Sequence, residues 1–289
     1  MDAPCIAVLM ASHNRCEKTL AALEALERQR DLPPGTSVRV HLVDAASTDG
    51  TPQRIAERFP DVDVVSVGPD VFWGEGMRIA AGRSVRPGLP PFTHHLWLND
   101  DVRLGDDALS LLLDTADEVG GKAVVVGAVH STDGGRTTYS GLRHTDRPWW
   151  HPYQHDLMMV EPSGRPEPCD THHGNVVLVP RQVRDRVGDI DRRFWHNMGD
   201  YDHGFRARRA GMGPFVAPRH VGACDTNPPL SGSKEPGIGA REALRRVTSR
   251  RELPCRAWWV YCARHLWPWA PVLMCSPYIK TFLRAMRSR

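Results

Sequence analysis

Apolar runs and helical spacings of apolar residues alternate through the first hundred residues of the chain. Four short apolar runs predict strands, at residues 6–11, 38–43, 62–67 and 94–98. The segments between them place apolar side chains at helical spacing and predict helices, at residues 16–30, 51–59 and 74–85. Asn14 stands where the N-cap of the first helix is expected. Strands separated by helices favour right-handed crossovers, so we expect an α/β fold with a mainly parallel, Rossmann-like sheet flanked by helices.

The pattern is less regular beyond residue 102. Residues 107–119 and 200–210 predict helices, and residues 123–129 and 175–179 predict strands. Residues 130–172 are rich in Gly, Pro, His and Trp, which is typical of long loops or short hairpins.

A change in composition divides the chain into two parts. Residues 226–240 are rich in Pro and Gly and predict a linker between a domain at 1–225 and a helical tail at 241–289. The tail holds 11 Lys and Arg against 2 Asp and Glu, a net charge of +9. The other 240 residues hold 26 basic and 32 acidic side chains, a net charge of −6.

The composition of the whole chain excludes several classes of protein. Of the 289 residues, 41% are hydrophobic and 25% are charged, which indicates a globular protein. The overall net charge of only +3 argues against a nucleic-acid binder. Seven cysteines without a CxxC pair indicate reduced thiols and a cytoplasmic location. Charges and prolines interrupt the apolar stretch at 257–283, so we expect no membrane-spanning helix.

The basic tail carries four tryptophans, at positions 258, 259, 267 and 269. Trp and basic side chains on one segment suit the interface of an anionic membrane, which would place the protein at the inner face of that membrane. A pair of helices packed on the catalytic domain, or on a second subunit in a homo-oligomer, would explain the same composition. The sequence leaves these readings open.

Acidic side chains follow several of the predicted strands. Asp44 ends the second strand, and Asp100 and Asp101 follow the fourth. A single Asp in such a place is often a turn or cap residue. Two adjacent carboxylates repel each other unless a cation compensates, and a divalent metal that holds a diphosphate is a natural compensation.

Four motifs in order give the chain a specific resemblance. They are residues 12–15 (SHNR) after the first strand, residues 43–51 after the second, residues 98–102 (LNDDV) after the fourth, and residues 200–211 (DYDHGFRARRAG). Together they resemble a family 2 glycosyltransferase of the GT-A fold, an inverting enzyme that uses a nucleotide sugar. The resemblance implies a nucleotide-binding half at 1–102 and an acceptor and catalytic half at 103–225.

The resemblance implies which residues bind the donor, a nucleoside-diphosphate sugar. The base and ribose would be held by Ser12, Asn14, Arg15 and Asp44, with Ser47 nearby. Asp100 would face the ribose or diphosphate, next to Asn99, and Asp101 would ligate Mn²⁺ or Mg²⁺. His220 falls where several members carry a histidine that contacts the metal or diphosphate. The segment with Gly74, Gly76 and Arg78 would contact the donor and help to choose the sugar.

The resemblance also implies a general base and an acceptor side. Asp200 matches the base that takes the proton of an acceptor hydroxyl, on a glycan, a glycolipid or a small molecule. Asp202 is the alternative carboxylate. Four residues are weaker acceptor-side candidates, since each could equally pack in a loop: Trp149, Trp150, His173 and Asn175. The Gln-x-x-Arg-Trp signature of processive members is absent, which favours a single addition in cell-surface glycan or glycoconjugate synthesis.

Two other functions stay open. A nucleotidyltransferase would make the activated sugar, but Ser12-His13-Asn14-Arg15 stands where such enzymes carry a glycine-rich basic loop. A non-catalytic protein that binds a nucleotide sugar or glycan would explain Gly199, which replaces the Glu that the family usually carries there.

Overall fold

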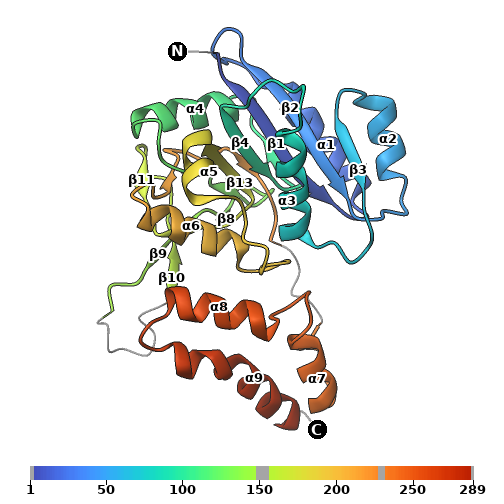
Figure 1. The fold of residues 1–289 in the computed structure, drawn as a ribbon, viewed down its shortest axis with the longest axis vertical. Helices are drawn as coiled ribbons and strands as arrows, with labels where there is room; N and C mark the ends of the chain where they lie inside the picture. Colours follow the sequence, from blue (N-terminus) through green and yellow to red (C-terminus); the bar gives the residue numbers. More distant parts are fainter. Residues whose placement is uncertain (1–2, 148–155, 227–231, 288–289) are drawn as a thin grey trace.

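The computed structural model describes residues 3–147, 156–226 and 232–287, and a large sheet forms its centre (Figure 1). Four strands of this sheet are parallel to one another, as predicted: β1 (Cys5–Ser12), β2 (Ser37–Asp44), β3 (Asp63–Ser66) and β4 (His94–Leu98). Three helices connect them: α1 (Cys16–Glu27), α2 (Thr51–Arg58) and α3 (Trp73–Ser84). The structure therefore confirms the alternation that the first hundred residues predict.

Helices cover both faces of the parallel strands, which explains why these strands read as continuous apolar runs. Successive side chains of β1 point to opposite faces. Ile6 and Val8 pack in the same cluster as Leu20 of α1, whereas Leu9 packs in the cluster that holds Met77 of α3. The core consequently lies in two layers, one on each face of the sheet.

Four more strands extend the sheet and make it mixed: β6 (Val125–Val126), β11 (Glu167–Pro168), β13 (Val176–Pro180) and β14 (Phe215–Val216). The complete order is β11-β14-β6-β13-β4-β1-β2-β3, and β13 runs antiparallel to β4. The described part of residues 103–225 also supplies three helices: α4 (Ala108–Glu118), α5 (Arg181–Val187) and α6 (Gly199–Arg209).

The described residues also form two small sheets. One contains β5 (Arg103–Leu104), β7 (Val129–His130), β8 (Thr137–Tyr139) and β15 (Gly222–Ala223). The other contains β9 (Gly141–His144), β10 (Leu157–Met159) and β12 (Thr171–His172). Within the described part of residues 130–172, the prediction of short hairpins is confirmed.

The strand predicted at residues 123–129 is in fact two short strands, β6 and β7, that belong to different sheets. Gly127 separates them at a very close contact. A Cβ atom at this position would lie 2.5 Å from Cγ2 of Val221 and 2.8 Å from Cγ1 of Val176. Only glycine fits this crossing without a shift of the neighbours, and the chain changes sheets there.

The N-cap predicted for Asn14 is wrong. Arg15 occupies the N-cap position of α1, and the carboxylate of Asp49 accepts the backbone N–H of Cys16 at 2.9 Å. Asn14 instead has a left-handed backbone, with φ of 52°, and its Oδ1 accepts the backbone N–H of Thr48 at 2.7 Å. The loops after β1 and β2 therefore hold each other in place.

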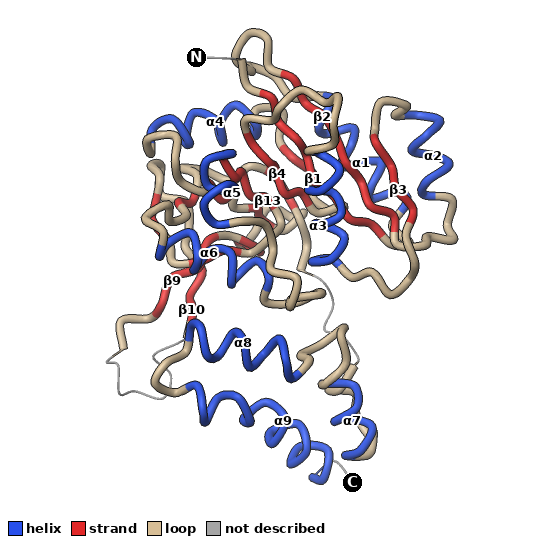
Figure 2. Tube along the Cα trace, in the orientation of Figure 1, coloured by secondary structure: helices blue, strands red, loops and turns tan. Residues whose placement is uncertain are grey.

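The described part of the C-terminal tail is helical, as predicted, and forms three helices: α7 (Ala240–Val247), α8 (Cys255–His265) and α9 (Ala270–Arg287). Figures 1 and 2 show them beyond the end of the sheet that is opposite the N-terminus. α8 packs on α6 of the main body, where the rings of Tyr261 and Phe205 lie 6.4 Å apart. The indole N–H of Trp258 joins α8 to α9 by donating to the carbonyl of Leu273 at 2.9 Å.

Among the described residues, no helix is both long enough and apolar enough to cross a membrane.

Candidate active site at the carboxyl ends of the parallel strands

The parallel register brings the predicted donor-binding residues to one edge of the large sheet. Ser12 and Asp44 are direct partners in the register of β1 and β2, and Asn99, Asp100 and Asp101 follow β4 at the same edge. This edge is where open α/β sheets bind their ligands. Strands that are far apart in the sequence therefore meet at one place because they run in the same direction.

Asp44 is fully buried at this edge and keeps one oxygen for a further partner. Its Oδ2 accepts the backbone N–H of Ser47 at 3.1 Å. Its Oδ1 is buried and has no hydrogen-bond donor among the described residues. An unsatisfied buried carboxylate oxygen is costly, so this atom is ready to accept a hydrogen bond from a ligand. The hydroxyl of Ser12 is 2.8 Å from that of Thr19 in α1.

Arg15 neutralises the two adjacent carboxylates. Its Nη1 donates to Oδ1 of Asp100 at 3.2 Å and to Oδ2 of Asp101 at 2.7 Å. Both aspartates are nearly fully buried, whereas Arg15 is about one-third exposed. Burial raises the pKa of Asp100 to about 6; the charge of Asp101 adds to this rise, and Arg15 opposes it. One guanidinium therefore supplies the compensation that such a pair of like charges needs.

The Asp100–Asp101 pair fits a divalent metal ion. Oδ2 of Asp100 is buried and has no partner among the described residues, and Oδ1 of Asp101 faces the thiol of Cys224 at 3.6 Å. Carboxylate oxygens are the ligands that Mg²⁺ takes together with substrate phosphates. The described residues contain no group of three or more His, Cys, Asp or Glu arranged for a metal, so phosphate oxygens and waters would complete the coordination.

His220 lies in the loop between β14 and β15 and contacts side chains of β7 and β8. Its Nε2 is 2.8 Å from the hydroxyl of Thr137, and its ring meets that of His130 edge to face at 5.4 Å. Thr137 also donates to the carboxylate of Glu161. Burial lowers the pKa of His220, and nearby His130 lowers it further. His220 therefore belongs to a polar group beside β8, and its metal-binding role stays a prediction.

Asp200 lies in the first turn of α6 and faces the loop before β13. Its Oδ1 accepts the backbone N–H of Tyr201 at 2.9 Å, and its Oδ2 accepts that of Gly174 at 3.0 Å. Burial raises the pKa of Asp200 to about 6, although both backbone hydrogen bonds favour the ionised form. The carboxylate is thus oriented by the backbone of two elements.

Gly199 has a packing reason for replacing the usual glutamate. A Cβ atom there would lie 2.7 Å from Cγ2 of Ile190, so a glutamate side chain would collide with the core. The residue before it, Met198, has a left-handed backbone with φ of 69°. This sharp entry into α6 places Asp200 at the site.

Trp73 is a site residue that the sequence did not reveal. Its indole N–H donates to Oδ1 of Asn99 at 2.8 Å. A Cβ atom at Gly174 would lie 2.5 Å from the Trp73 ring and 3.3 Å from Cβ of Asp200, so the three residues are in tight contact. The position of Trp73 at the start of a helix after the third strand was the only signal in the sequence. Cys224, beside Asp101, was missed in the same way.

His173 and Asn175 lie in the loop before β13, between Asp200 and Asp101. Nε2 of His173 is 3.1 Å from the hydroxyl of Tyr201, and Nδ1 lies 3.0 Å from the carbonyl of Ser140. Asn175 is buried and points its amide at the sulfur of Cys224, at 3.9 Å. Their acceptor-side role stays a prediction, and Trp149 and Trp150 lie outside the described residues.

Asp202 is engaged in a buried group of charged side chains. Its side chain is fully buried, and it accepts hydrogen bonds from Arg206 at 2.7 Å and Arg264 at 2.9 Å. Nε2 of His265 is 2.9 Å from the same carboxylate. Burial disfavours the charge of Asp202, but these partners outweigh it and lower the pKa to about 2. Asp202 therefore links α6 and α8, and its predicted role as the alternative carboxylate on the acceptor side stays a prediction.

The segment around Gly74 and Gly76 packs closely against its neighbours. A Cβ at Gly74 would lie 2.8 Å from the carbonyl oxygen of Phe194, and one at Gly76 would lie 3.0 Å from Cβ of Ala11. Both glycines thus have a packing reason as well as the predicted donor-binding one. Arg78 buries its Nε without a partner among the described residues.

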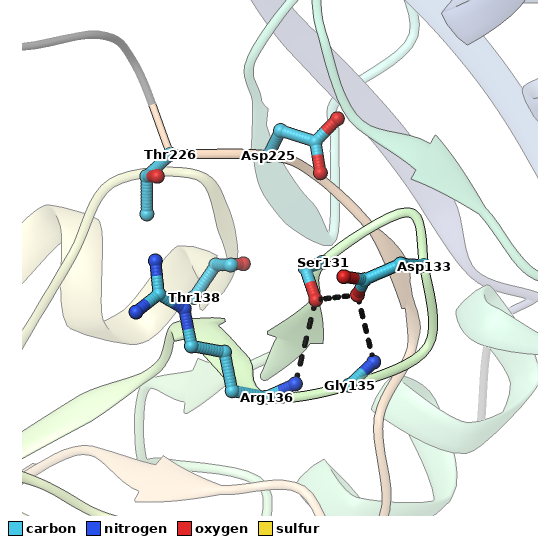
Figure 3. Close-up of a pocket in the computed structure, with 7 residues that line it drawn as sticks. All are labelled: Ser131, Asp133, Gly135, Arg136, Thr138, Asp225 and Thr226. Carbon is cyan, nitrogen blue, oxygen red and sulfur yellow. Dashed lines mark hydrogen bonds between the residues drawn. The ribbon is translucent and has the colours of Figure 1, made fainter.

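A polar pocket of about 530 Å³ opens beside Cys224. Figure 3 shows its lining, in which Ser131, Asp133 and Gly135 form a hydrogen-bonded turn: the full set is Ser131, Asp133, Gly135, Arg136, Thr138, Asp225 and Thr226. The hydroxyl of Thr138 donates to the carbonyl of Cys224 at 2.6 Å. Cys224 therefore contacts a residue of the pocket through its carbonyl and Asp101 through its thiol.

Comparison with known proteins identifies relatives of the chain. The sequence model described as "Glycosyl transferase family 2" matches residues 7–177. An N-acetylglucosaminyl-diphospho-decaprenol L-rhamnosyltransferase of Mycobacterium tuberculosis is 29% identical over 233 residues, which cover 72% of this chain and 71% of the relative.

Two solved structures share the fold. A mannosyltransferase from Pyrobaculum calidifontis, PcManGT in complex with GDP-Man and Mn²⁺, aligns with a TM-score of 0.53 at 16% identity and covers 100% of this chain and 74% of its own. TarS 1–349 of S. aureus in complex with UDP aligns with a TM-score of 0.52 at 12% identity, over 89% of this chain and 70% of its own.

Proposed function

The chain belongs to glycosyl transferase family 2, and from this premise we propose that it moves a sugar from a nucleoside-diphosphate sugar to an acceptor hydroxyl with inversion and with the help of a divalent metal. Glycosyltransferase activity follows from the family. The observation that carries the rest of the proposal is the buried Asp100–Asp101 pair held by Arg15 at the carboxyl ends of the strands. Such a pair suits a ligand that combines phosphates with a cation.

The nucleoside of the donor would bind at the ends of β1 and β2. The unpaired Oδ1 of Asp44 accepts a hydrogen bond from a ribose hydroxyl or a base N–H. Asn14 and Ser47 line the same loops, where the backbone N–H of Asn14 donates to the hydroxyl of Ser47 at 2.9 Å. Ser12, Asn99, Gly74, Gly76 and Arg78 complete the proposed donor site.

Asp100 and Asp101 would hold Mn²⁺ or Mg²⁺, which when bound supplies positive charge against the developing charge of the leaving diphosphate. Arg15 is placed to add a second positive charge at the same edge. It bridges both carboxylates through Nη1, so a bound ion would share or take over its partners. The relative PcManGT was solved with Mn²⁺, which supports a divalent ion without fixing its identity here.

Asp200 acts as the general base in this proposal. A hydroxyl is a weak nucleophile, and a carboxylate within hydrogen-bond reach takes its proton as it attacks the anomeric carbon. Displacement from the side opposite the diphosphate then inverts the configuration. The backbone N–H groups of Gly174 and Tyr201 fix the carboxylate, so little reorganisation is needed at the moment of reaction.

The proposed acceptor is a glycolipid hydroxyl in cell-surface polysaccharide synthesis. The 29% identical relative is named for transfer to a decaprenol-linked N-acetylglucosaminyl diphosphate. In this chain, the polar pocket beside Cys224 carries one guanidinium, that of Arg136, and two carboxylates, those of Asp133 and Asp225, which suit the hydroxyl groups of an acceptor sugar. His173, Asn175 and the segment with Trp149 and Trp150 remain proposed acceptor contacts.

The test is release of nucleoside diphosphate from a panel of UDP-, dTDP- and GDP-sugars, with Mn²⁺ or Mg²⁺ and a lipid-diphosphate sugar as acceptor. Asp101→Asn and Asp200→Asn should each lower transfer by about 10²-fold or more. Asp114→Asn, an exposed carboxylate on α4, is the matched control and should leave the rate unchanged.

Two outcomes would contradict the proposal. One is the absence of turnover with every donor although nucleotide binds, as expected of a binding protein. The other is the formation of nucleotide sugar and pyrophosphate from a nucleoside triphosphate, as expected of a nucleotidyltransferase. Full activity of Asp200→Asn would remove Asp200 from the base role alone.

A further inference from the structure

The tail exposes a group of large apolar side chains to solvent, which we call the tail face: Trp259, Trp267, Val272, Ile279, Phe282, Leu283 and Met286. Trp267 is 73% exposed, Val272 62% and Ile279 55%. Seven of the ten large hydrophobic side chains that are exposed in the described residues lie here, in the last 29 residues of that region. A concentration of exposed apolar side chains on one segment is typical of an interaction site.

The exposed side chains of α9 form one stripe along the helix. Val272, Ile279, Phe282 and Met286 are separated by seven, three and four residues, which places them on the same side. The opposite side of α9 is buried at Ala270, Thr281 and Ala285 against the rest of the tail. The stripe is therefore additional to the contacts that hold the three helices together.

Cations accompany the tail face. Lys280 and Arg287 are exposed on α9 and Arg256 on α8. The tail has a net charge of +9, and its two acids are already engaged: Glu242 with Arg245 and Arg246, and Glu252 with the backbone of Ser233. The surface thus presents apolar and positively charged groups together.

The tail is firmly joined to the element that carries Asp200. Arg264 and His265 of α8 hold Asp202 of α6, only two residues from Asp200. Asn197, just before α6, donates to the carbonyl of Glu252 at 2.8 Å. Figure 1 shows the tail beyond the same end of the sheet at which the parallel strands finish. The tail face and the active site therefore keep a fixed relation.

We propose that the tail face binds the surface of an anionic lipid bilayer, with α9 lying in the interface. Apolar side chains would enter the headgroup region, with Trp267 and Trp259 at the depth that tryptophan prefers, and the cations would meet lipid phosphates. A second copy of the chain fits less well, because a two-fold contact would bring two tails of +9 face to face. This inference concerns a surface apart from the transfer site, and it holds whether or not the proposed reaction is correct.

The experiment is flotation of the full-length protein with vesicles of phosphatidylcholine alone, or of phosphatidylcholine mixed with phosphatidylglycerol. Binding should require the anionic lipid. Ile279→Ser/Phe282→Ser should weaken it by at least about tenfold without any change of charge, because two apolar side chains no longer enter the interface. Val85→Ser/Leu89→Ser, at two exposed apolar positions outside the tail, is the matched control and should bind like the wild type.

A second variant tests the electrostatic part. Lys280→Gln/Arg287→Gln should weaken binding to the anionic vesicles by about fivefold for each cation removed, and high salt should weaken wild-type binding in the same way. Thermal unfolding of each variant shows whether it is folded.

Three results would overturn the proposal. They are equal binding to both kinds of vesicle, wild-type binding by Ile279→Ser/Phe282→Ser, or a dimer in light scattering that this variant abolishes while the wild type ignores vesicles. The last result would identify the tail face as a contact between two copies.

Discussion

At the scale of single residues, the active edge depends on how a few buried charges are compensated. Arg15 bridges Asp100 and Asp101, whereas Oδ1 of Asp44 and Oδ2 of Asp100 keep no partner among the described residues. Folding therefore leaves two buried oxygens that can accept a hydrogen bond from a ligand or bind a cation. A site built in this way gains stability when its ligand binds, because binding removes a cost that the free protein carries.

Replacing Arg15 by a neutral side chain tests this compensation. Arg15→Met leaves two adjacent carboxylates without their cation, which we expect to lower the free energy of unfolding by about 1–3 kcal/mol, less than for a fully buried pair because Arg15 is partly exposed. Urea denaturation measures the loss. Mn²⁺ should raise the midpoint of the variant more than that of the wild type, since the ion meets uncompensated carboxylates.

The control for Arg15→Met is Arg54→Met, which removes an exposed ion pair between Arg54 of α2 and Glu17 of α1. Such a pair contributes little, so the change should stay within about 0.5 kcal/mol. An Arg15→Met protein as stable as the wild type, with no added effect of Mn²⁺, would contradict the compensating role.

The raised pKa of Asp200 predicts a pH dependence. A general base must be ionised, so the transfer rate should rise with pH through about 6, the value to which burial raises this pKa. The effect of rising pH on the stability of the fold has the opposite sign. The native carboxyl binds a proton more tightly than the unfolded one, so this group makes folding less favourable as pH rises from about 4 to 6.

Initial rates measured between pH 5 and 8 test the predicted fall of the transfer rate at acidic pH, which is the acidic limb of the pH–rate profile. The residual activity of Asp200→Asn should lack the limb that belongs to Asp200, while nucleotide affinity at neutral pH should not change. If this variant keeps the same acidic limb, the titration belongs to another group. Asp100 is the first candidate, because burial raises its pKa to the same region.

At the scale of elements, α6 is held from both of its sides. Its first turn supplies Asp200 to the site, and Asp202 in the same turn anchors Arg264 and His265 of α8. Arg206 completes the link by pairing with Asp202 and donating to the carbonyl of Asp189 at 3.0 Å. The orientation of the proposed base is therefore coupled to the tail.

Breaking this link should be costly. Asp202→Asn removes the fully buried negative charge that compensates Arg206 and Arg264. We expect this change to lower the free energy of unfolding by about 3 kcal/mol. The pKa of Asp202 is lowered to about 2, so its stabilisation is present above about pH 4 and is lost as pH falls through about 2. The difference between wild type and Asp202→Asn should accordingly shrink in strong acid.

Denaturant titration at several pH values measures this difference, and limited proteolysis shows whether α8 leaves α6. Asp185→Asn, which removes an exposed pair with Arg181 on α5, is the matched control and should change little. A neutral effect of Asp202→Asn at pH 7 would show that the cluster contributes nothing to the attachment.

The sequence predicted the elements better than their connections. Apolar periodicity located the strands and helices of the first half because each of them buries one continuous face. It missed the change of sheet at Gly127, which depends on the contact with Val221, and the cap from Asp49, which comes from another loop. The motifs identified Asp100, Asp101 and Asp200. They could not distinguish the role of Asp202 from that of Asp200, because the partners of Asp202, Arg264 and His265, lie about sixty positions away in the sequence.

At the scale of the whole molecule, the tail and the main body share one hydrophobic cluster. Ala257, Tyr261 and Cys262 of α8 are buried in the same cluster as Phe205 of α6 and Val177 of the central sheet. The predicted boundary between residues 225 and 241 therefore does not separate two independent cores. We expect the chain to unfold as one cooperative unit.

Removal of residues 241–289 tests this cooperation. The truncated chain would expose Phe205 and leave Asp202 without Arg264, so its thermal midpoint should fall by at least about 5 °C. Calorimetry of the intact chain should show a single transition. Two separate transitions, or a truncated chain with an unchanged midpoint, would show that the tail is an independent unit.

The antiparallel direction of β13 has a consequence for how such an enzyme diversifies. Because β13 runs against β4, the chain enters it at the reactive edge, and Asn175 lies beside Asn99, whose N–H donates to its carbonyl at 3.0 Å. In the proposed reaction, the segment before β13 would therefore contact the acceptor, whereas most of the proposed nucleotide-binding residues follow the strands that precede it in the chain. Exchange of residues 130–172 between homologous chains should therefore change the acceptor that is chosen and keep the donor, and evolution is free to vary one substrate independently of the other.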